Sequence, residues 1–184
     1  MRRIRNVLRA LAASSTLALS FAAAAQAPDS VYTQHDPGRC PVVREHETGR
    51  THRCTGHRGI PVSYEIDEHS VLVGIGTAGE VASTPFLVRR FAEAGDTVEW
   101  RGPRGRGGIE PRAAILRFRV TEGPSIGAKR HDVLVVYRLD PARSCIAAVL
   151  DGRSPDANAQ ARRIADGEAR RFRCGRDAPP GFGE

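Results

Sequence analysis

Several features on which functional assignments usually depend are absent from this sequence. It contains no C-x-x-C pair, the motif of dithiol redox enzymes. Lys129 is the only lysine, so almost all of the 28 basic residues are arginine. Beyond the N-terminus, no segment approaches the roughly 20 consecutive apolar residues that a membrane-spanning helix needs. These absences argue against a thioredoxin-like redox enzyme and against a mature protein that crosses a membrane with a helix.

The N-terminus has the organisation of a secretory signal peptide. Four arginines precede an apolar stretch from about Ala10 to Ala25, and Ala25-Gln26-Ala27 is an A-x-A cleavage signal. The stretch is short and ends in small residues, which disfavours a membrane anchor. We therefore predict that residues 1–27 are removed on export to the periplasm or the medium. Cleavage leaves about 157 residues with 24 Lys and Arg against 21 Asp and Glu, a net charge of +3.

The four cysteines agree with export to an oxidising compartment. Four cysteines allow three pairings, and the local one joins Cys40 to Cys54 and Cys145 to Cys174. Residues 40 and 54 flank a predicted hairpin with its turn at Glu47-Thr48-Gly49, which favours this pairing. Each bridge stabilises the fold by about 3 to 4 kcal/mol in the chain-entropy model.

The same hairpin offers an alternative as a metal site, because five potential zinc ligands lie within 18 residues. Their spacing, C-x5-H-x5-H-x-C-x2-H, lacks the closely spaced ligand pairs of a structural zinc site. We therefore predict a disulfide and no metal. The ligands concerned are Cys40, His46, His52, Cys54 and His57.

The rest of the chain predicts an α+β fold: a mainly antiparallel sheet with one helix packed on it. Ser154-Pro155-Asp156 is a helix start, after which Ala157, Ala161, Ile164 and Ala165 line one narrow apolar face. Two apolar strands, Asp132 to Leu139 and Cys145 to Leu150, are predicted to be central and covered on both faces. The predicted strands are Ile60 to Ile66, Ser70 to Ile75, Thr97 to Arg101, Ala113 to Val120, Asp132 to Leu139 and Cys145 to Leu150.

The predicted domain runs from residue 28 to residue 176 as a single unit. A shorter helix is expected from Pro85 to Ala94, between Thr84 as its cap and Gly95 as its stop. The last residues, 177–184, contain little to bury, and we expect a disordered tail.

The segment VGIGTAGE, residues 73–80, matches the G-x-G-x-x-G pattern of dinucleotide-binding loops. In that fold the helix begins inside the glycine loop, so that its amide groups meet the pyrophosphate. Here the next helix signal comes later, at Thr84-Pro85, and the proline interrupts a helix that starts at the loop. We therefore predict that the glycines end a strand and that no nucleotide cofactor binds.

The segment RGPRGRGG, residues 101–108, resembles the RGG repeats of RNA-binding proteins. The simpler interpretation is a loop that joins the strand with Trp100 to the strand with Phe118, and export removes nucleic acid as a natural partner. Anionic components of the cell envelope remain as partners. The candidate anion-binding residues are Arg101, Arg104 and Arg106, with Arg112 close by.

Four stretches around the cysteines resemble a group of small exported proteins of Gram-negative bacteria. They are HDPGRC, HRCTGHRGIPVSY, VLVVYRLDPARSC and ARRFRCG, and the resemblance extends from Val31 to Arg176. The resemblance implies the periplasm and a disulfide-bonded domain but no activity. Our functional prediction is a non-enzymatic, envelope-associated binding module, which a flat basic or aromatic patch near Trp100 would favour. The alternative is a small periplasmic enzyme whose site would be a deep, dry pocket with converging polar groups.

Overall fold

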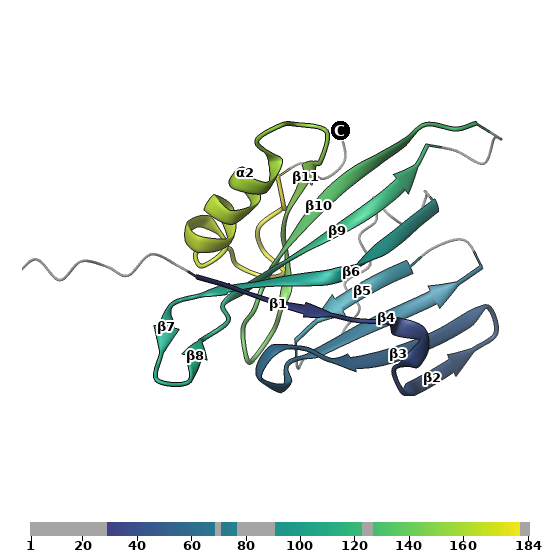
Figure 1. Ribbon diagram of the computed structural model, residues 1–184, viewed down its shortest axis with the longest axis horizontal. Helices are drawn as coiled ribbons and strands as arrows, with labels where there is room; N and C mark the ends of the chain where they lie inside the picture. The colour runs from purple at the N-terminus through teal and green to yellow at the C-terminus, as the bar shows by residue number, and fades with distance from the viewer. Residues whose placement is uncertain (1–28, 69–70, 77–90, 123–126, 181–184) are drawn as a thin grey trace, which may run out of the picture.

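The fold is seen in a computed structural model of the chain, which describes residues 29–68, 71–76, 91–122 and 127–180 (Figure 1). The predicted signal peptide lies outside these residues. Among the described residues, no helix is both long and apolar enough to cross a membrane.

The larger sheet has five antiparallel strands, and its order along the sheet is β1-β6-β9-β10-β11. The predicted alternation is confirmed in β9, where Leu116, Phe118 and Val120 are buried between the sheets and Arg119 is exposed. The strands are β1 (Asp29–Gln34), β6 (Phe91–Gly102), β9 (Ala113–Thr121), β10 (Arg130–Arg138) and β11 (Cys145–Asp151).

The smaller sheet has four antiparallel strands in sequence order. The predicted hairpin is confirmed, since His46 pairs with Gly49 across the turn. A minor hairpin and two single-turn helices complete the connections. The strands are β2 (Val42–His46), β3 (Gly49–Thr55), β4 (Pro61–Asp67) and β5 (Val71–Ile75); the minor hairpin is β7 (Arg104–Gly105) with β8 (Gly108–Ile109), and the helices are η1 (Pro37–Arg39) and η2 (His57–Gly59).

The two sheets enclose the main hydrophobic core. Val62 and Tyr64 of the smaller sheet are fully buried against it, as are Val98, Trp100 and Phe118 of the larger sheet. Alternate residues of a strand point to opposite faces, so the remaining apolar residues of β9, β10 and β11 lie on the outer face of the larger sheet. That outer face is the one covered by the helix (Figure 1).

The predicted C-terminal helix is confirmed as α2 (Ala157–Arg163), which continues into a wider turn, η3 (Ile164–Glu168). All four predicted face residues, Ala157, Ala161, Ile164 and Ala165, are buried against the larger sheet. Small side chains allow the helix to lie close to the strands. The predicted α+β class, with one packed helix, is therefore correct.

Both predicted disulfides are present, Cys40–Cys54 and Cys145–Cys174, and the chain has no free cysteine. No group of three or more metal-ligating side chains occurs within the part of the chain that the structure describes. The first bridge ties the segment after η1 to β3, and Cys54 belongs to the core between the sheets. The second ties the segment after η3 to the first residue of β11.

Two predictions about the secondary structure are wrong in part. The segment Cys145 to Leu150 is covered on both faces as predicted, but β11 is an edge strand and not a central one. Residues Phe91 to Ala94 belong to β6 and not to a helix, while the rest of the predicted helix, residues 85–90, lies outside the described residues.

The start of the predicted disordered tail contacts the edge strand. The backbone N–H of Val149 in β11 donates a hydrogen bond to the carbonyl of Pro180 at 3.1 Å. Asp177 accepts hydrogen bonds from the backbone N–H and the guanidinium of Arg173. These residues partly cover the edge of the sheet, which explains how an edge strand can be as apolar as a central one.

The segment with the dinucleotide-like pattern begins as the end of a strand. Gly74 lies inside β5, which is antiparallel to β4, and Gly76 follows the last strand residue with φ of +114°. An L side chain rarely adopts this backbone conformation, and a Cβ at Gly76 would overlap Ser144. The glycine therefore serves the turn out of the strand, as predicted, and residues 77–80 of the motif lie outside the described residues.

Candidate anion-binding groove

The three arginines predicted to bind an anion occupy different surroundings. Arg104 and Arg106 lie on the exposed β7–β8 hairpin, which forms the predicted connection between the strands with Trp100 and Phe118. Arg101 lies at the end of β6 beneath η3, and only 8% of its surface is exposed. The fold therefore separates Arg101 from the two arginines of the hairpin, and their binding to an anion stays a prediction.

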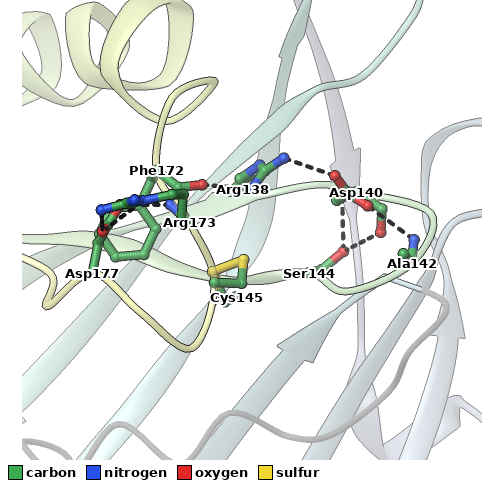
Figure 2. The surroundings of a disulfide bond; sticks show 9 residues. Arg138, Asp140, Ala142, Ser144, Cys145, Phe172, Arg173 and Asp177 are labelled. Atoms are coloured by element: carbon green, nitrogen blue, oxygen red, sulfur yellow. Dashed lines mark hydrogen bonds and ion pairs between the residues drawn. A yellow bond between two sulfur atoms is a disulfide. The ribbon is translucent and has the colours of Figure 1, made fainter.

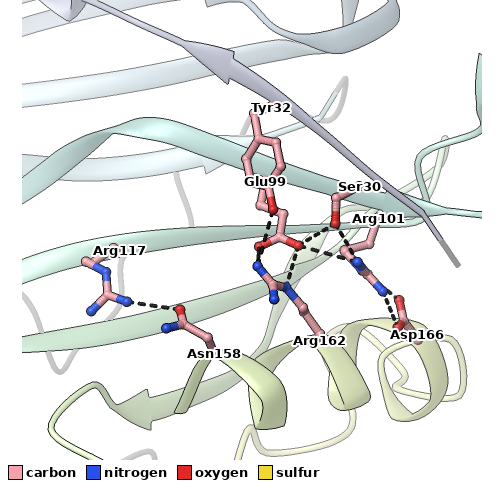
Figure 3. A network of polar contacts seen from close by, with 8 residues as sticks. All are labelled: Ser30, Tyr32, Glu99, Arg101, Arg117, Asn158, Arg162 and Asp166. Atoms are coloured by element: carbon pink, nitrogen blue, oxygen red, sulfur yellow. Dashed lines mark hydrogen bonds and ion pairs between the residues drawn. The ribbon is translucent and has the colours of Figure 1, made fainter. Parts of the chain in front are cut away.

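Arg101 belongs to a polar network between the helical segment and the edge of the larger sheet (Figure 3). Its guanidinium donates two hydrogen bonds to the carboxylate of Asp166, the Nε bond at 2.9 Å, and one to the hydroxyl of Ser30. Arg162 of α2 donates to both carboxylate oxygens of Glu99, at 2.8 and 3.2 Å. Arg101 also lies 3.4 Å from Glu99, so both arginines contact that carboxylate, and Asp166 is the further partner of Arg101.

The ionisation of these groups follows from their partners. Burial alone raises the pKa of Glu99, but hydrogen bonds from Arg162 and Ser30 and the charges of Arg162 and Arg101 outweigh it. The pKa of Glu99 therefore lies below its ordinary value, and the carboxylate stays charged. The hydrogen bonds that Arg101 donates to Asp166 raise the pKa of Arg101. The network is a structural link between the helical segment and the sheet, and Arg101 does not offer its charge to a ligand.

Two arginines that line a groove beside this network carry charges that no described carboxylate neutralises. Arg112 precedes β9, and Arg170 follows η3; both are exposed, and neither forms an ion pair with any described residue. A groove of about 210 Å³ lies between them and the Arg101–Asp166 pair. A second groove of about 500 Å³ extends from the same two arginines toward Arg138.

The larger groove also contains carboxylates, but one of them is neutralised within the groove. Arg138 donates to Asp140 at 2.7 Å, while Glu110 forms no ion pair among the described residues. Backbone hydrogen bonds from Ala142 and Arg143, together with the charge of Arg138, lower the pKa of Asp140. Arg112 and Arg170 therefore leave the two grooves with an excess of unpaired positive charge. We call these adjoining grooves, which share Arg112 and Arg170, the arginine groove.

The second disulfide holds the segment that carries Arg170 (Figure 2). Cys174 lies four residues beyond Arg170 and is bonded to Cys145 at the start of β11. The guanidinium of Arg138 in β10 also donates a hydrogen bond to the backbone carbonyl of Phe172. The position of Arg170 relative to Arg112 is thus set by one covalent bond and one charged hydrogen bond.

The sequence analysis named Arg112 among the candidates and missed Arg170. Arg170 is one of six arginines from Arg162 to Arg176, and no local pattern distinguishes it from Arg163 or Arg171. Its place beside Arg112 depends on the packing of η3 against the larger sheet. No sequence signal short of the tertiary structure identifies it.

A series of side-chain hydrogen bonds crosses the core around Trp100. Trp100 is fully buried and contributes no aromatic surface of its own. Its indole N–H donates to the hydroxyl of Thr33 at 2.8 Å, and the Thr33 hydroxyl lies 3.1 Å from Nε2 of His35. Nδ1 of His35 lies 2.9 Å from the phenol of Tyr64 in β4. These hydrogen bonds link Trp100 of the larger sheet to Tyr64 of the smaller sheet through Thr33 and His35.

The buried His35 makes the stability of the fold sensitive to acid. Burial lowers the pKa of His35 below its ordinary value of 6.5. The unfolded chain therefore binds a proton at His35 over a pH range in which the folded chain does not. The free energy of unfolding is expected to fall as the pH decreases below about 6.5. Urea unfolding at pH values above and below 6.5 measures this slope.

The matched control is His35→Gln, whose amide forms hydrogen bonds but does not titrate. This variant is expected to be less stable at neutral pH. Its free energy of unfolding should depend less on pH between 7 and 5, because the titrating imidazole has been removed. An unchanged slope in the variant would show that other groups cause the acid sensitivity.

The described grooves are open to solvent, and no described pocket is the deep, dry cavity expected of the enzyme alternative. That alternative stays a prediction. No known protein family matches the chain, and comparisons with curated proteins and with solved structures also found no match. The function is therefore inferred from the geometry of the chain's own side chains.

Proposed function

We propose that this protein is an exported binding module of the bacterial envelope and that it holds an anionic group of an envelope component in the arginine groove. The single observation that carries the proposal is the presence on one concave surface of two exposed guanidinium groups, Arg112 and Arg170, that form no ion pair with a described residue. A guanidinium is planar and binds carboxylate and phosphate groups through paired hydrogen bonds.

Export is the second part of this proposal. The A-x-A signal Ala25-Gln26-Ala27, the two disulfides and the resemblance to small exported proteins of Gram-negative bacteria support it. In that compartment the abundant anions are the phosphates and acidic sugars of the envelope. Nucleic acid is not a partner in this proposal.

The test compares salt elution from an immobilised lipopolysaccharide matrix. Arg112→Ser with Arg170→Ser is expected to weaken binding by about tenfold, because two exposed contacts of up to about 1 kcal/mol each are lost. The wild-type protein should elute at higher salt than this variant, since added ions screen exposed charge pairs.

The control removes the same charge elsewhere. Arg39 and Arg171 are exposed and form no ion pair with a described residue, so Arg39→Ser with Arg171→Ser leaves the arginine groove intact. If both double variants elute at the same salt, retention depends on net charge alone and the groove is not the site. A third variant, Arg104→Ser with Arg106→Ser, tests the hairpin arginines separately.

A further inference from the structure

A further groove, separate from the two that form the arginine groove, lies on the other side of the polar network. It has a volume of about 340 Å³, within the range of sites that bind small molecules. Its aliphatic residues are Ile115 of β9 and Leu134 of β10, and polar side chains from β1, β6 and α2 surround them. We call it the tyrosine groove, after Tyr32 in β1.

The tyrosine groove combines an exposed aromatic ring with planar polar groups. Tyr32 is 54% exposed although it is a large hydrophobic residue, and its phenol accepts a hydrogen bond from Arg162 at 3.2 Å. Asn158 of α2 is exposed and its Oδ1 accepts from Arg117 at 3.0 Å, which leaves the amide N–H groups unpaired among the described residues (Figure 3). The site therefore offers an apolar ring face, amide donors and guanidinium edges side by side.

This combination fits the chemistry of a sugar ring. One face of a pyranose carries C–H groups, which pack on an aromatic ring, and its rim carries hydroxyl groups, which bond to amide and guanidinium groups. A β-bulge in β6 adds to the site: β6 advances four residues from Ala94 to Val98 where β9 advances two. Bulges redirect side chains and occur beside binding sites. Here the bulge brings Asp96 and Thr97 to the rim of the groove.

The two grooves lie along one strand. Glu99 lines the tyrosine groove and Arg101 lines the arginine groove, and alternate residues of β6 point to the same face of the sheet. Between the grooves stands the Glu99–Arg162 pair, and the side chain of Arg162 is 42% exposed. The two grooves therefore lie on either side of the ion pairs Glu99–Arg162 and Arg101–Asp166.

We propose that the protein binds an acidic saccharide, with a sugar ring against Tyr32 and a carboxylate or phosphate of the same chain between Arg112 and Arg170. This inference rests on the proposed function, because it names the class of ligand that the arginine groove holds. Two arginines alone bind any polyanion; the tyrosine groove supplies the selectivity for sugar.

The experiment measures binding of three probes by calorimetry at one salt concentration. They are oligogalacturonate, an uncharged malto-oligosaccharide of equal length, and oligoglutamate of equal charge. The wild-type protein is expected to bind oligogalacturonate most tightly. Tyr32→Ala should weaken this binding by about tenfold, whereas Tyr32→Phe, which keeps the ring, should bind like the wild type. Val43→Ala, at another exposed apolar residue, is the matched control, and thermal unfolding checks that each variant is folded.

The outcomes separate this inference from the proposed function. If Tyr32→Ala binds oligogalacturonate as well as the wild type, or if oligoglutamate binds equally well, the saccharide inference is overturned while the arginine groove stands. If Arg112→Ser with Arg170→Ser binds both charged probes like the wild type, the proposed function itself fails. Weakened oligogalacturonate binding in both variants, with weak binding of oligoglutamate, supports the acidic saccharide.

Discussion

Replacing Cys145 and Cys174 by alanine is expected to lower the free energy of unfolding by about 3.5 kcal/mol. The bridge closes a loop with a sequence separation of 29 residues, and the chain-entropy model assigns a loss of this size to its removal. The bridge also fixes the segment of Arg170 to β11, so the same variant should lose affinity for an anionic matrix. Urea unfolding monitored by tryptophan fluorescence measures the first effect, because Trp100 is buried and is the only tryptophan.

The other bridge provides the comparison. Cys40 and Cys54 are separated by 14 residues, for which the same model gives about 3 kcal/mol. Cys40→Ala with Cys54→Ala should therefore destabilise the fold by a similar amount but leave the arginine groove intact. A loss of less than about 1 kcal/mol on removal of Cys145–Cys174 would contradict the prediction. It would mean that the hydrogen bonds of Phe172 and Pro180 hold the segment without the bridge.

Replacing Asp166 by alanine is expected to destabilise the fold by about 2 to 3 kcal/mol. The side chains of Arg101 and Asp166 are 10% and 22% exposed, so the change leaves a largely buried guanidinium without its main partner. Removing one partner of a buried ion pair typically destabilises a fold by more than the intact pair stabilises it. Because Asp166 is partly exposed, we expect a loss of stability at the low end of the range for buried pairs. Chemical denaturation of the variant measures the loss.

A double variant distinguishes an unpaired charge from lost packing. Arg101→Leu with Asp166→Leu removes both charges, and it should be more stable than Asp166→Ala alone. The exposed pair of Arg153 with Asp151 is the control, and Arg153→Ala should leave the unfolding midpoint nearly unchanged. If the double variant is the least stable of the set, the network stabilises the fold through its hydrogen bonds and not merely by neutralising Arg101.

The polar network also determines which arginines can be replaced without changing the stability of the fold. A substitution of Arg101 disturbs the link between η3 and β6, and a substitution of Arg162 leaves Glu99 without one of its partners. Either change alters stability as well as charge. For this reason Arg112 and Arg170, together with Arg39 and Arg171, make a cleaner comparison of binding than variants that include Arg101 or Arg162.

Much of the fold could be predicted because its signals are local. The hairpin between Cys40 and Cys54 follows from a turn sequence and the spacing of two cysteines. The helix after Pro155 follows from a cap and four small apolar residues on one face. The edge position of β11 could not be predicted, because a strand covered by α2, by the second sheet and by the residues near Pro180 has the same apolar sequence as a central strand.

The amino-acid sequence by itself determined most of the strands, the C-terminal helix and the favoured disulfide pairing, since each depends on residue periodicity or on neighbours close along the chain. Only the tertiary structure decided which arginines are open to a ligand. Arg101 and Arg112 are equally basic in the sequence, but η3 covers Arg101 and places Asp166 against it, while Arg112 faces a groove with Arg170. The environment of a charge depends on what the fold packs over it, and residues far apart in the chain supply that cover.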